Sequence, residues 1–526
     1  MRYVLKRSIL LLAVAVLMAS CAPSRKTTTT MTHPRPIPTV PSPNVPPSAP
    51  EAPVQITVAY PVPDQWRPNV DSNFIFGTVG NGRAALTING YPVPVWQNGA
   101  FLAFLPMPGD GVYHLVAQHG NDIDSTTVAY RPRSIGTTKE TKSEAVHKDF
   151  RPPLQTVIVK GSDTLQTGDD VAPGALTPDG NREWFFPRGT RLDVVEQEGR
   201  YYKVKLDKET DAWVADTNFD THIVNAPSHP DQRGEVEPRA GYIDLILPTD
   251  YNAFRITPNG VQLQIHVYGR VEPSRLNTTV PDPLISSVAY DSTGEGTEFT
   301  VQLNKPVWGY KAFYTEAGLL DVRIRRPPTI DPSNPLKGIR IMLDPGHPPG
   351  GAIGPTGLTE REANLDEALR VRKQLAAKGA IVLMTHTTLE GLVSDYNQVE
   401  ELDARALLAV DDNVDLMVSL HNNAFPDGTD PFLNYGSSTY YFNPFSAELA
   451  ADLDHSISEV TGIPNLGSFE KSLAICRPTW MPCALTESLY MMFPDQEAKL
   501  RDLGFMDTLA AAHVQGIEDF LRERAQ

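Results

Sequence analysis

The chain has 526 residues, a net charge of −17, and 41% hydrophobic and 21% charged side chains. Its length predicts several domains, and its acidic balance argues against binding to nucleic acid or anionic lipid through a basic surface. Three Cys are too few for a disulfide-dense scaffold. No apolar run reaches about 18 residues, so we expect no ordinary transmembrane helix.

The N-terminus has the pattern of an export signal. Three basic side chains precede the apolar run Ile9–Met18, which is too short to span a bilayer. The next residues, Met18-Ala19-Ser20-Cys21, resemble a bacterial lipobox. This implies a signal peptide over residues 1–20 and a lipid anchor on Cys21; a plain secretory signal is the alternative. Ala22 favours the outer membrane, facing the periplasm, over retention in the inner membrane.

Residues 21–54 are predicted to be the lipidated Cys followed by a linker. Residues 22–54 hold ten Pro, a run of four Thr and almost no aliphatic side chains, so they cannot bury enough apolar surface to fold. Pro favours an extended chain of about 3.1 Å per residue, which gives a reach on the order of 100 Å. The linker would let folded domains work at a distance from the membrane.

Two segments predict β-rich modules from alternation alone. In residues 55–132 the strand Ala85–Ile88 leads into the turn Asn89-Gly90, which favours an immunoglobulin-like sandwich. Residues 235–330 also show segments of period two, among them Tyr242–Leu247, and predict a further β domain.

Between them, residues 152–224 resemble a bacterial SH3-like barrel. The resemblance depends on three segments, namely Pro187–Leu192, Gly199–Val204 and Ala212–Val214. It implies either a module that binds cell-wall peptides or a spacer, and both interpretations stay open.

The pattern changes after Pro335. Residues 336–526 alternate short strands with helices, which predicts an α/β domain with a mixed sheet flanked by helices. In the first helix one face is expected to hold Leu365, Ala368, Leu369, Leu375 and Ala376. Functional groups should gather at the carboxyl ends of the strands. The expected strands are Ile339–Leu343, Ile381–Met384 and Val414–Leu420, and the other helices are Val399–Val410, Ala447–Val460 and Met506–Leu521.

Four motifs in this domain point to a family. They are Asp344-Pro345-Gly346-His347, Gly354 to Leu365 with its Glu360 and Asn364, Ser419 to Ala424 around His421, and Met481 to Glu487. Together, in this order, they resemble the zinc-dependent N-acetylmuramoyl-L-alanine amidases of the Amidase_3 type. The β domain at 235–330 is similar to targeting domains that precede some of these enzymes.

The resemblance implies a Zn²⁺ site with His347, Glu360 and His421 as ligands. Two imidazoles, one carboxylate and a water satisfy tetrahedral zinc and leave room for substrate. Glu487 aligns with the catalytic glutamate, which would take a proton from the attacking water and return it to the leaving amine. Asn423 and His386 are further candidates for substrate contact. His386 replaces an Arg of the family, and packing or an extra ligand role for it stays open.

The implied function is cleavage of the amide between N-acetylmuramic acid and L-alanine in peptidoglycan. The implied location is the cell envelope, and no nucleic-acid partner is expected. Two alternatives remain: a non-catalytic lipoprotein that binds peptidoglycan, and a zinc peptidase that acts within stem peptides.

Two local features bear on structure and regulation. Cys476 and Cys483 are either bridged or two buried thiols, and the resemblance favours thiols. Only Phe425–Tyr435 separates the second His motif from the next strand, and its Pro residues disfavour a helix. The loop therefore should not plug the site, and restraint would come from the linker, the β modules or an unidentified regulator.

Overall fold

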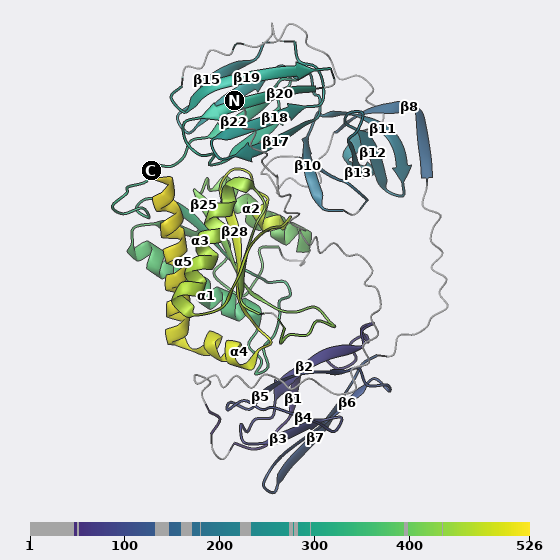
Figure 1. Ribbon diagram of the computed structural model, residues 1–526, viewed down its shortest axis with the longest axis vertical. Helices are drawn as coiled ribbons and strands as arrows, with labels where there is room; N and C mark the ends of the chain where they lie inside the picture. Colours follow the sequence, from purple (N-terminus) through teal and green to yellow (C-terminus); the bar gives the residue numbers. More distant parts are fainter. Residues whose placement is uncertain are drawn as a thin grey trace, which may run out of the picture. The chain divides into compact units, whose positions relative to one another are not determined.

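The computed structural model describes residues 47–49, 52–131, 147–158, 171–178, 180–220, 233–272, 277, 282–294, 296–393, 398–433 and 435–525 (Figure 1). Within them, three β-rich modules precede a C-terminal α/β domain, which confirms the β-rich multidomain organisation. The predicted signal peptide, the lipidation site Cys21 and most of the linker lie outside the described residues.

The first module consists of two antiparallel sheets over one core. Asn89 and Gly90, at φ +49° and +81°, form the predicted turn. Val54 is buried in this core and its N–H donates to Asp122 (2.7 Å), so the module begins before residue 55. The sheets are β1-β2-β5 and β4-β3-β6-β7, with β1 Thr57–Tyr60, β2 Ser72–Thr78, β3 Ala85–Ile88, β4 Tyr91–Val93, β5 Ala100–Pro106, β6 Val112–His119 and β7 Asp122–Ala129.

The second module is one antiparallel sheet with the order β10-β9-β13-β12-β11-β8-β14. It begins at His147, earlier than the predicted residue 152, because β8 pairs with β11 from its first residue. Trp184 and Phe186 lie in its core. Its strands are β8 His147–Ile158, β9 Val171–Ala175, β10 Arg182–Pro187, β11 Arg191–Glu198, β12 Tyr201–Lys205, β13 Asp211–Ala215 and β14 Phe219–Asp220.

The third module pairs two four-stranded sheets, β15-β16-β22-β21 and β17-β18-β20-β19, over a single core. The predicted strand Tyr242–Leu247 is confirmed as β16. The other strands are β15 Glu235–Pro238, β17 Phe254–Asn259, β18 Gln262–Val267, β19 Ile285–Thr293, β20 Gly296–Leu303, β21 Tyr310–Tyr314 and β22 Leu320–Arg325.

The C-terminal domain is built on a six-stranded mixed sheet with the order β24-β23-β25-β28-β26-β27. Only the β26–β28 pairing is antiparallel. The strands are β23 Arg340–Pro345, β24 Ile381–Met384, β25 Leu416–Asn423, β26 Ser437–Tyr441, β27 Asn465–Glu470 and β28 Cys483–Tyr490. The helices are α1 Glu360–Ala377, α2 Gln398–Asp411, α3 Ala447–Thr461, α4 Pro494–Arg501 and α5 Leu503–Arg524.

Helices cover both faces of this sheet, as predicted. Successive strand residues point to opposite faces, so Ile341 and Leu343 pack with α1, α3 and α5, while Met342 packs with α2. The buried face of α1 differs from the expected one. Leu369, expected on the buried face, is exposed, whereas the polar residues Asn364 and Glu367 are fully buried. They belong to the buried hydrogen-bond network described below.

The outer face of β22 joins the third module to the C-terminal domain. The buried Arg325 guanidinium donates to the carbonyl of Val414 (2.6 Å) and pairs with Asp415 (2.9 Å). Trp308, also buried, donates from Nε1 to the carbonyl of Asp415 (2.9 Å), and its ring lies 5.8 Å from that of Phe520. The two units therefore share buried polar and aromatic contacts.

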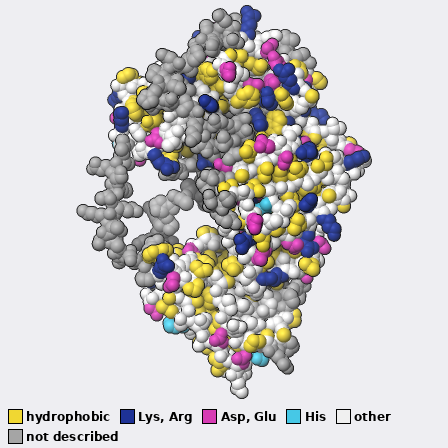
Figure 2. Space-filling view, turned by 180° about the vertical axis from the view of Figure 1, so that it is seen from behind, with side chains coloured by type: hydrophobic (Ala, Val, Ile, Leu, Met, Phe, Trp, Pro, Cys, Tyr) yellow, Lys and Arg dark blue, Asp and Glu magenta, His cyan; other side chains and the backbone are white. Residues whose placement is uncertain are grey.

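None of the described helices combines the length and apolarity that crossing a membrane requires. On the face drawn in Figure 2, Lys and Arg side chains are interspersed with Asp and Glu and do not gather into one basic patch.

Candidate metal and catalytic site

Three predicted ligands meet where strand ends converge. His347 follows β23, His421 lies near the end of β25, and Glu360 opens α1. Because β23 and β25 are parallel neighbours, their carboxyl ends share one edge of the sheet. One donor atom from each of His347, Glu360 and His421 lies within 4.8 Å of the others. The structure thus brings together the residues that the sequence singled out.

Contacts within the cluster direct the imidazoles. His347 Nε2 is 3.2 Å from Glu360 Oε2, and His421 Nδ1 is 3.1 Å from Glu360 Oε1. His347 Nδ1 is 3.0 Å from the carbonyl of Pro349, which can only accept a hydrogen bond. Nδ1 therefore donates to this carbonyl, and Nε2 is the ring nitrogen directed into the cluster, the orientation that metal-ligating His usually shows.

Glu360 is held in its charged form. Its side chain is 5% exposed, and it accepts hydrogen bonds from the N–H groups of Ala352 (2.8 Å) and Asn422 (3.3 Å). Burial alone raises the pKa of Glu360, but hydrogen bonds and charge from His347 and His421 outweigh it and lower the pKa. An ionised carboxylate between two imidazoles suits a divalent cation.

The backbone around the cluster leaves no room for larger residues. A Cβ on Gly346 would lie 2.3 Å from Cε1 of His421, closer than any real contact. Gly351 has φ +102°, and a Cβ there would lie 3.1 Å from Cγ of His347. Both glycines allow the chain to pass against the two imidazole rings, and two imidazoles with one carboxylate are a donor set that would suit Zn²⁺.

Glu487 lies beside the cluster on the next strand. Glu487 is the register partner of His421 in the parallel strands β25 and β28. Both residues line one pocket of about 350 Å³. Its Oε2 is buried, and no described residue offers it a hydrogen bond. Burial, then the charge of Glu360, raise the pKa of Glu487 well above its ordinary value. A carboxyl group held in this way is suited to exchange protons with a bound reactant.

The pocket wall also includes Asn423, whose contact with substrate stays a prediction. The loop after His421 contains turns, and its described residues form no helix, as predicted. Asp427 of this loop accepts hydrogen bonds from Tyr60 and Asn73 (2.9 Å for Asn73).

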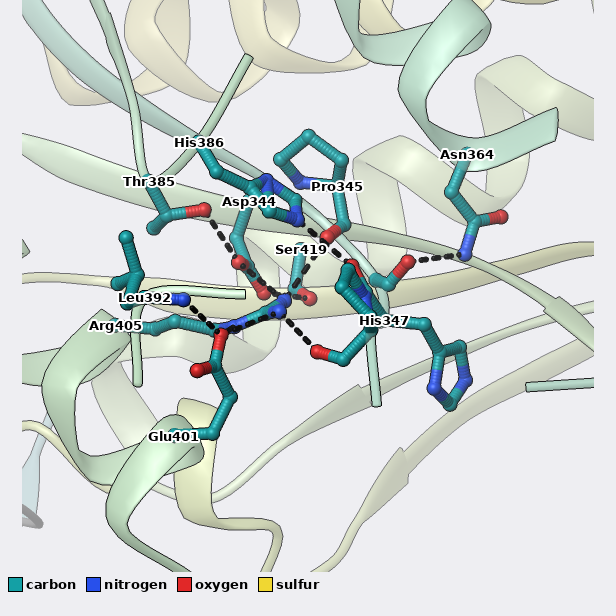
Figure 3. Close-up of polar contacts among 12 residues, drawn as sticks. Asp344, Pro345, His347, Asn364, Thr385, His386, Leu392, Glu401, Arg405 and Ser419 are labelled. Atoms are coloured by element: carbon teal, nitrogen blue, oxygen red, sulfur yellow. Dashed lines mark hydrogen bonds and ion pairs between the residues drawn. The ribbon is translucent and has the colours of Figure 1, made fainter. Parts of the chain in front are cut away.

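Arg405 of α2 organises the loop that carries His347 (Figure 3). Its side chain is 1% exposed. The guanidinium pairs with Asp344 (3.1 Å) and Glu401 (2.9 Å), and it donates to the carbonyls of Pro345 (3.0 Å) and Pro348. Because its five donors form a rigid fork, one side chain fixes both sides of His347.

His386 belongs to the same arrangement. It is 7% exposed, and its Nε2 lies 2.7 Å from the carbonyl of His347, so Nε2 carries the donated proton. His386 is not among the residues that line the pocket, so the structure does not support the predicted substrate contact. Instead its hydrogen bond stabilises the backbone of His347, which has φ +62°. This backbone conformation costs about 1–3 kcal/mol without such contacts.

We expect Arg405→Lys to weaken metal binding by about 10–100-fold. Lysine keeps the charge but cannot reach two carboxylates and two carbonyls at once. Titration of the metal-free protein against a chromophoric chelator measures this affinity. Arg372→Lys, at an exposed position of α1, is the matched control. Unchanged affinity in Arg405→Lys would mean that the loop holds its conformation without the fork.

Sequence reasoning missed a buried polar chain behind the ligands. Asn364 donates to the carbonyl of Gly346 (3.0 Å), and Asn422 donates to Asn364 (2.9 Å). Farther along α1, buried Glu367 lies 3.3 Å from the hydroxyl of Ser488. Burial raises the pKa of Glu367 to about 8. The E-x-x-x-N spacing was visible as a motif, but nothing in the residue types indicated that these groups are buried.

The two cysteines of this domain are free and buried. Burial raises the pKa of Cys476 to about 12, and it raises that of Cys483 as well. Of the two alternatives left open by the sequence, the buried thiols are therefore the one that the structure supports.

Comparison with known proteins locates the resemblance in this domain. Residues 341–519 match the Amidase_3 family, described as N-acetylmuramoyl-L-alanine amidase. The N-acetylmuramoyl-L-alanine amidase LytC of Bacillus subtilis (strain 168) is 30% identical over 195 residues, which are 36% of this chain and 37% of that protein. The probable cell wall amidase LytH of Staphylococcus epidermidis (strain ATCC 12228 / FDA PCI 1200) is 29% identical over 194 residues.

The match to LytH covers 36% of this chain and 60% of LytH, so the chain spans less than two thirds of either relative. Among solved structures, an N-acetylmuramoyl-L-alanine amidase from Clostridium difficile 630 is 26% identical and has a TM-score of 0.32. The alignment covers 35% of this chain and 97% of that one.

Proposed function

We propose that this chain, whose residues 341–519 form an Amidase_3 domain, is a zinc-dependent peptidoglycan amidase. It would cleave the amide between N-acetylmuramic acid and L-alanine. The observation that carries the proposal is the convergence of His347, Glu360 and His421 beside a pocket that both imidazoles share with Glu487, whose buried Oε2 has no hydrogen-bond partner among the described residues. The amidase names of the two relatives support the choice of substrate.

The reaction assigns a task to each residue. When bound, Zn²⁺ polarises the scissile carbonyl and lowers the pKa of an attacking water. His347 and His421 would hold the metal through neutral imidazoles, and Glu360 would supply the negative charge. Glu487 Oε2 accepts the proton of the attacking water and returns it to the leaving amine of L-alanine. Asn423, on the pocket wall, would orient the sugar or peptide side of the amide.

Two rival functions are separated by the products. We expect purified protein to release stem peptides from sacculi, leaving a free muramic carboxyl and a new L-Ala amine, and to stop when a chelator is added. Mass spectrometry of the fragments identifies the bond cut. Cleavage within stem peptides would favour a zinc peptidase, and binding to sacculi without release would favour a non-catalytic wall-binding protein.

The location follows from the same proposal. An enzyme with this substrate works in the cell envelope, and the relative LytH is named a cell wall amidase. The lipid on Cys21 and the outer-membrane anchor remain predictions from the export pattern of the first 21 residues. An unidentified regulator remains a prediction from the short loop after His421.

A further inference from the structure

One cation in the active-site pocket has no carboxylate partner. Arg405 and Lys471 both line the pocket, but Arg405 is already paired with Asp344 and Glu401. Lys471 is exposed, and no ion pair is found for it among the residues that the structure describes. Its charge acts on the Glu487 carboxyl, where it opposes the rise in pKa that burial causes, and its ammonium forms no ion pair among the described residues, so it can also meet an anionic ligand in the pocket.

The Lys471 ammonium is held in place by its surroundings. The residue follows β27, and its N–H donates to the carbonyl of Tyr441 (2.7 Å). The ammonium lies 5.1 Å from the centre of the Tyr440 ring, a cation–π contact that limits its freedom. Leu473, Ala474 and Ile475 continue the same wall and give the position an apolar flank.

Strand register places this charge at a defined reach from the reacting bond. Tyr440 pairs with Leu485, two residues before Glu487 on β28, so the side chains of Tyr440 and Glu487 point to the same face of the sheet. Diagonal neighbours of this kind have Cα atoms about 7–8 Å apart. Lys471 follows Glu470, the β27 partner of Tyr441, and its ammonium lies over Tyr440 and acts on the charge of Glu487. An anionic group bound there would therefore lie a short stretch of extended chain from the cleaved amide.

We propose that Lys471 and the Tyr440 ring form an anion subsite, which binds a free carboxylate on the stem-peptide residue that follows L-alanine. The inference depends on the proposed amidase function and adds a substrate preference to it. In a peptidoglycan stem this residue is a glutamate whose α-carboxyl is either free or amidated. The subsite selects the free form, because the amide has no charge to offer the ammonium.

The test compares two soluble muropeptides that differ only in this carboxyl, free in one and amidated in the other. Wild-type enzyme should prefer the free carboxylate by about tenfold in kcat/KM, since a hydrogen bond to a charged group is worth about 1.5 kcal/mol. Lys471→Met keeps an aliphatic side chain over the Tyr440 ring and removes the charge. It should raise KM about tenfold more on the free carboxylate than on the amidated substrate, whereas any change in kcat that comes through the charge on Glu487 should be the same for both substrates. Lys471→Glu should reverse the preference.

Lys373→Met, at an exposed position of α1, is the matched control and should retain the preference. Equal effects of Lys471→Met on the KM of both substrates, or no effect, would overturn the subsite. Wild-type cleavage of both substrates at equal rates would also overturn it and leave the amidase function standing. If the zinc-loaded wild type cleaves neither, the proposed function itself fails.

Discussion

Replacing Glu487 with Gln should leave the metal site filled and lower kcat by about 10²–10⁴-fold, the range lost with general acid–base catalysis. Gln has nearly the same shape but cannot accept a proton. The carboxyl has a buried oxygen without a partner, so the neutral amide should also leave the melting temperature unchanged or higher, as often happens when a catalytic group is removed. Zinc content, kcat on a muropeptide and calorimetric unfolding are the three measurements.

Glu459→Gln is the matched control, because Glu459 lies at an exposed position of α3. It should retain full activity and zinc content. Near-normal turnover of Glu487→Gln would assign proton transfer to another group, and zinc loss in this variant would make Glu487 a part of the metal site.

Replacing His421 with Ala should abolish metal binding and activity together. The change leaves one imidazole and one carboxylate, too few to hold zinc as a catalytic site does. Losing the metal removes several kcal/mol of transition-state stabilisation, which is at least about a 10³-fold loss of kcat/KM. Elemental analysis of the purified protein measures zinc, and circular dichroism checks that the fold is intact.

His455→Ala serves as its control. His455 is an exposed side chain of α3 near Glu459 (3.5 Å), and exposed pairs of this kind contribute little to stability. It should bind zinc and turn over substrate as the wild type does. Full zinc occupancy in His421→Ala would remove His421 from the ligand set.

The secondary structure of the C-terminal domain was largely predictable from the sequence. Apolar runs and helical spacing placed β24 at Ile381–Met384 without error, and α2 and α3 within one residue at each end. The strand β27 and helix α4 were missed, because Asn465–Glu470 is not strongly apolar and Pro494–Arg501 is short and charged. Tertiary packing decides such weak local preferences.

The residues of the metal cluster and Glu487 were predictable, whereas Arg405, Tyr440 and Lys471, which also line the pocket, were not. His347, Glu360, His421 and Glu487 sit in motifs whose order carries information. Arg405 stands on a helix among ordinary residues, where a lone Arg usually points to solvent. Its burial follows only from the fold, which turns α2 toward the end of β23 and supplies Asp344 as a partner.

The contacts of Arg325 and Trp308 bear on how this chain can be divided. A fragment that begins at residue 336 contains the three candidate metal ligands, yet it lacks both of these side chains. It would leave the Val414 carbonyl without its donor and expose the Phe520 face to water. The third module thus supplies side chains that complete the buried surface of the C-terminal domain. Fragments and fusions of this chain should therefore keep residues 233–525 together.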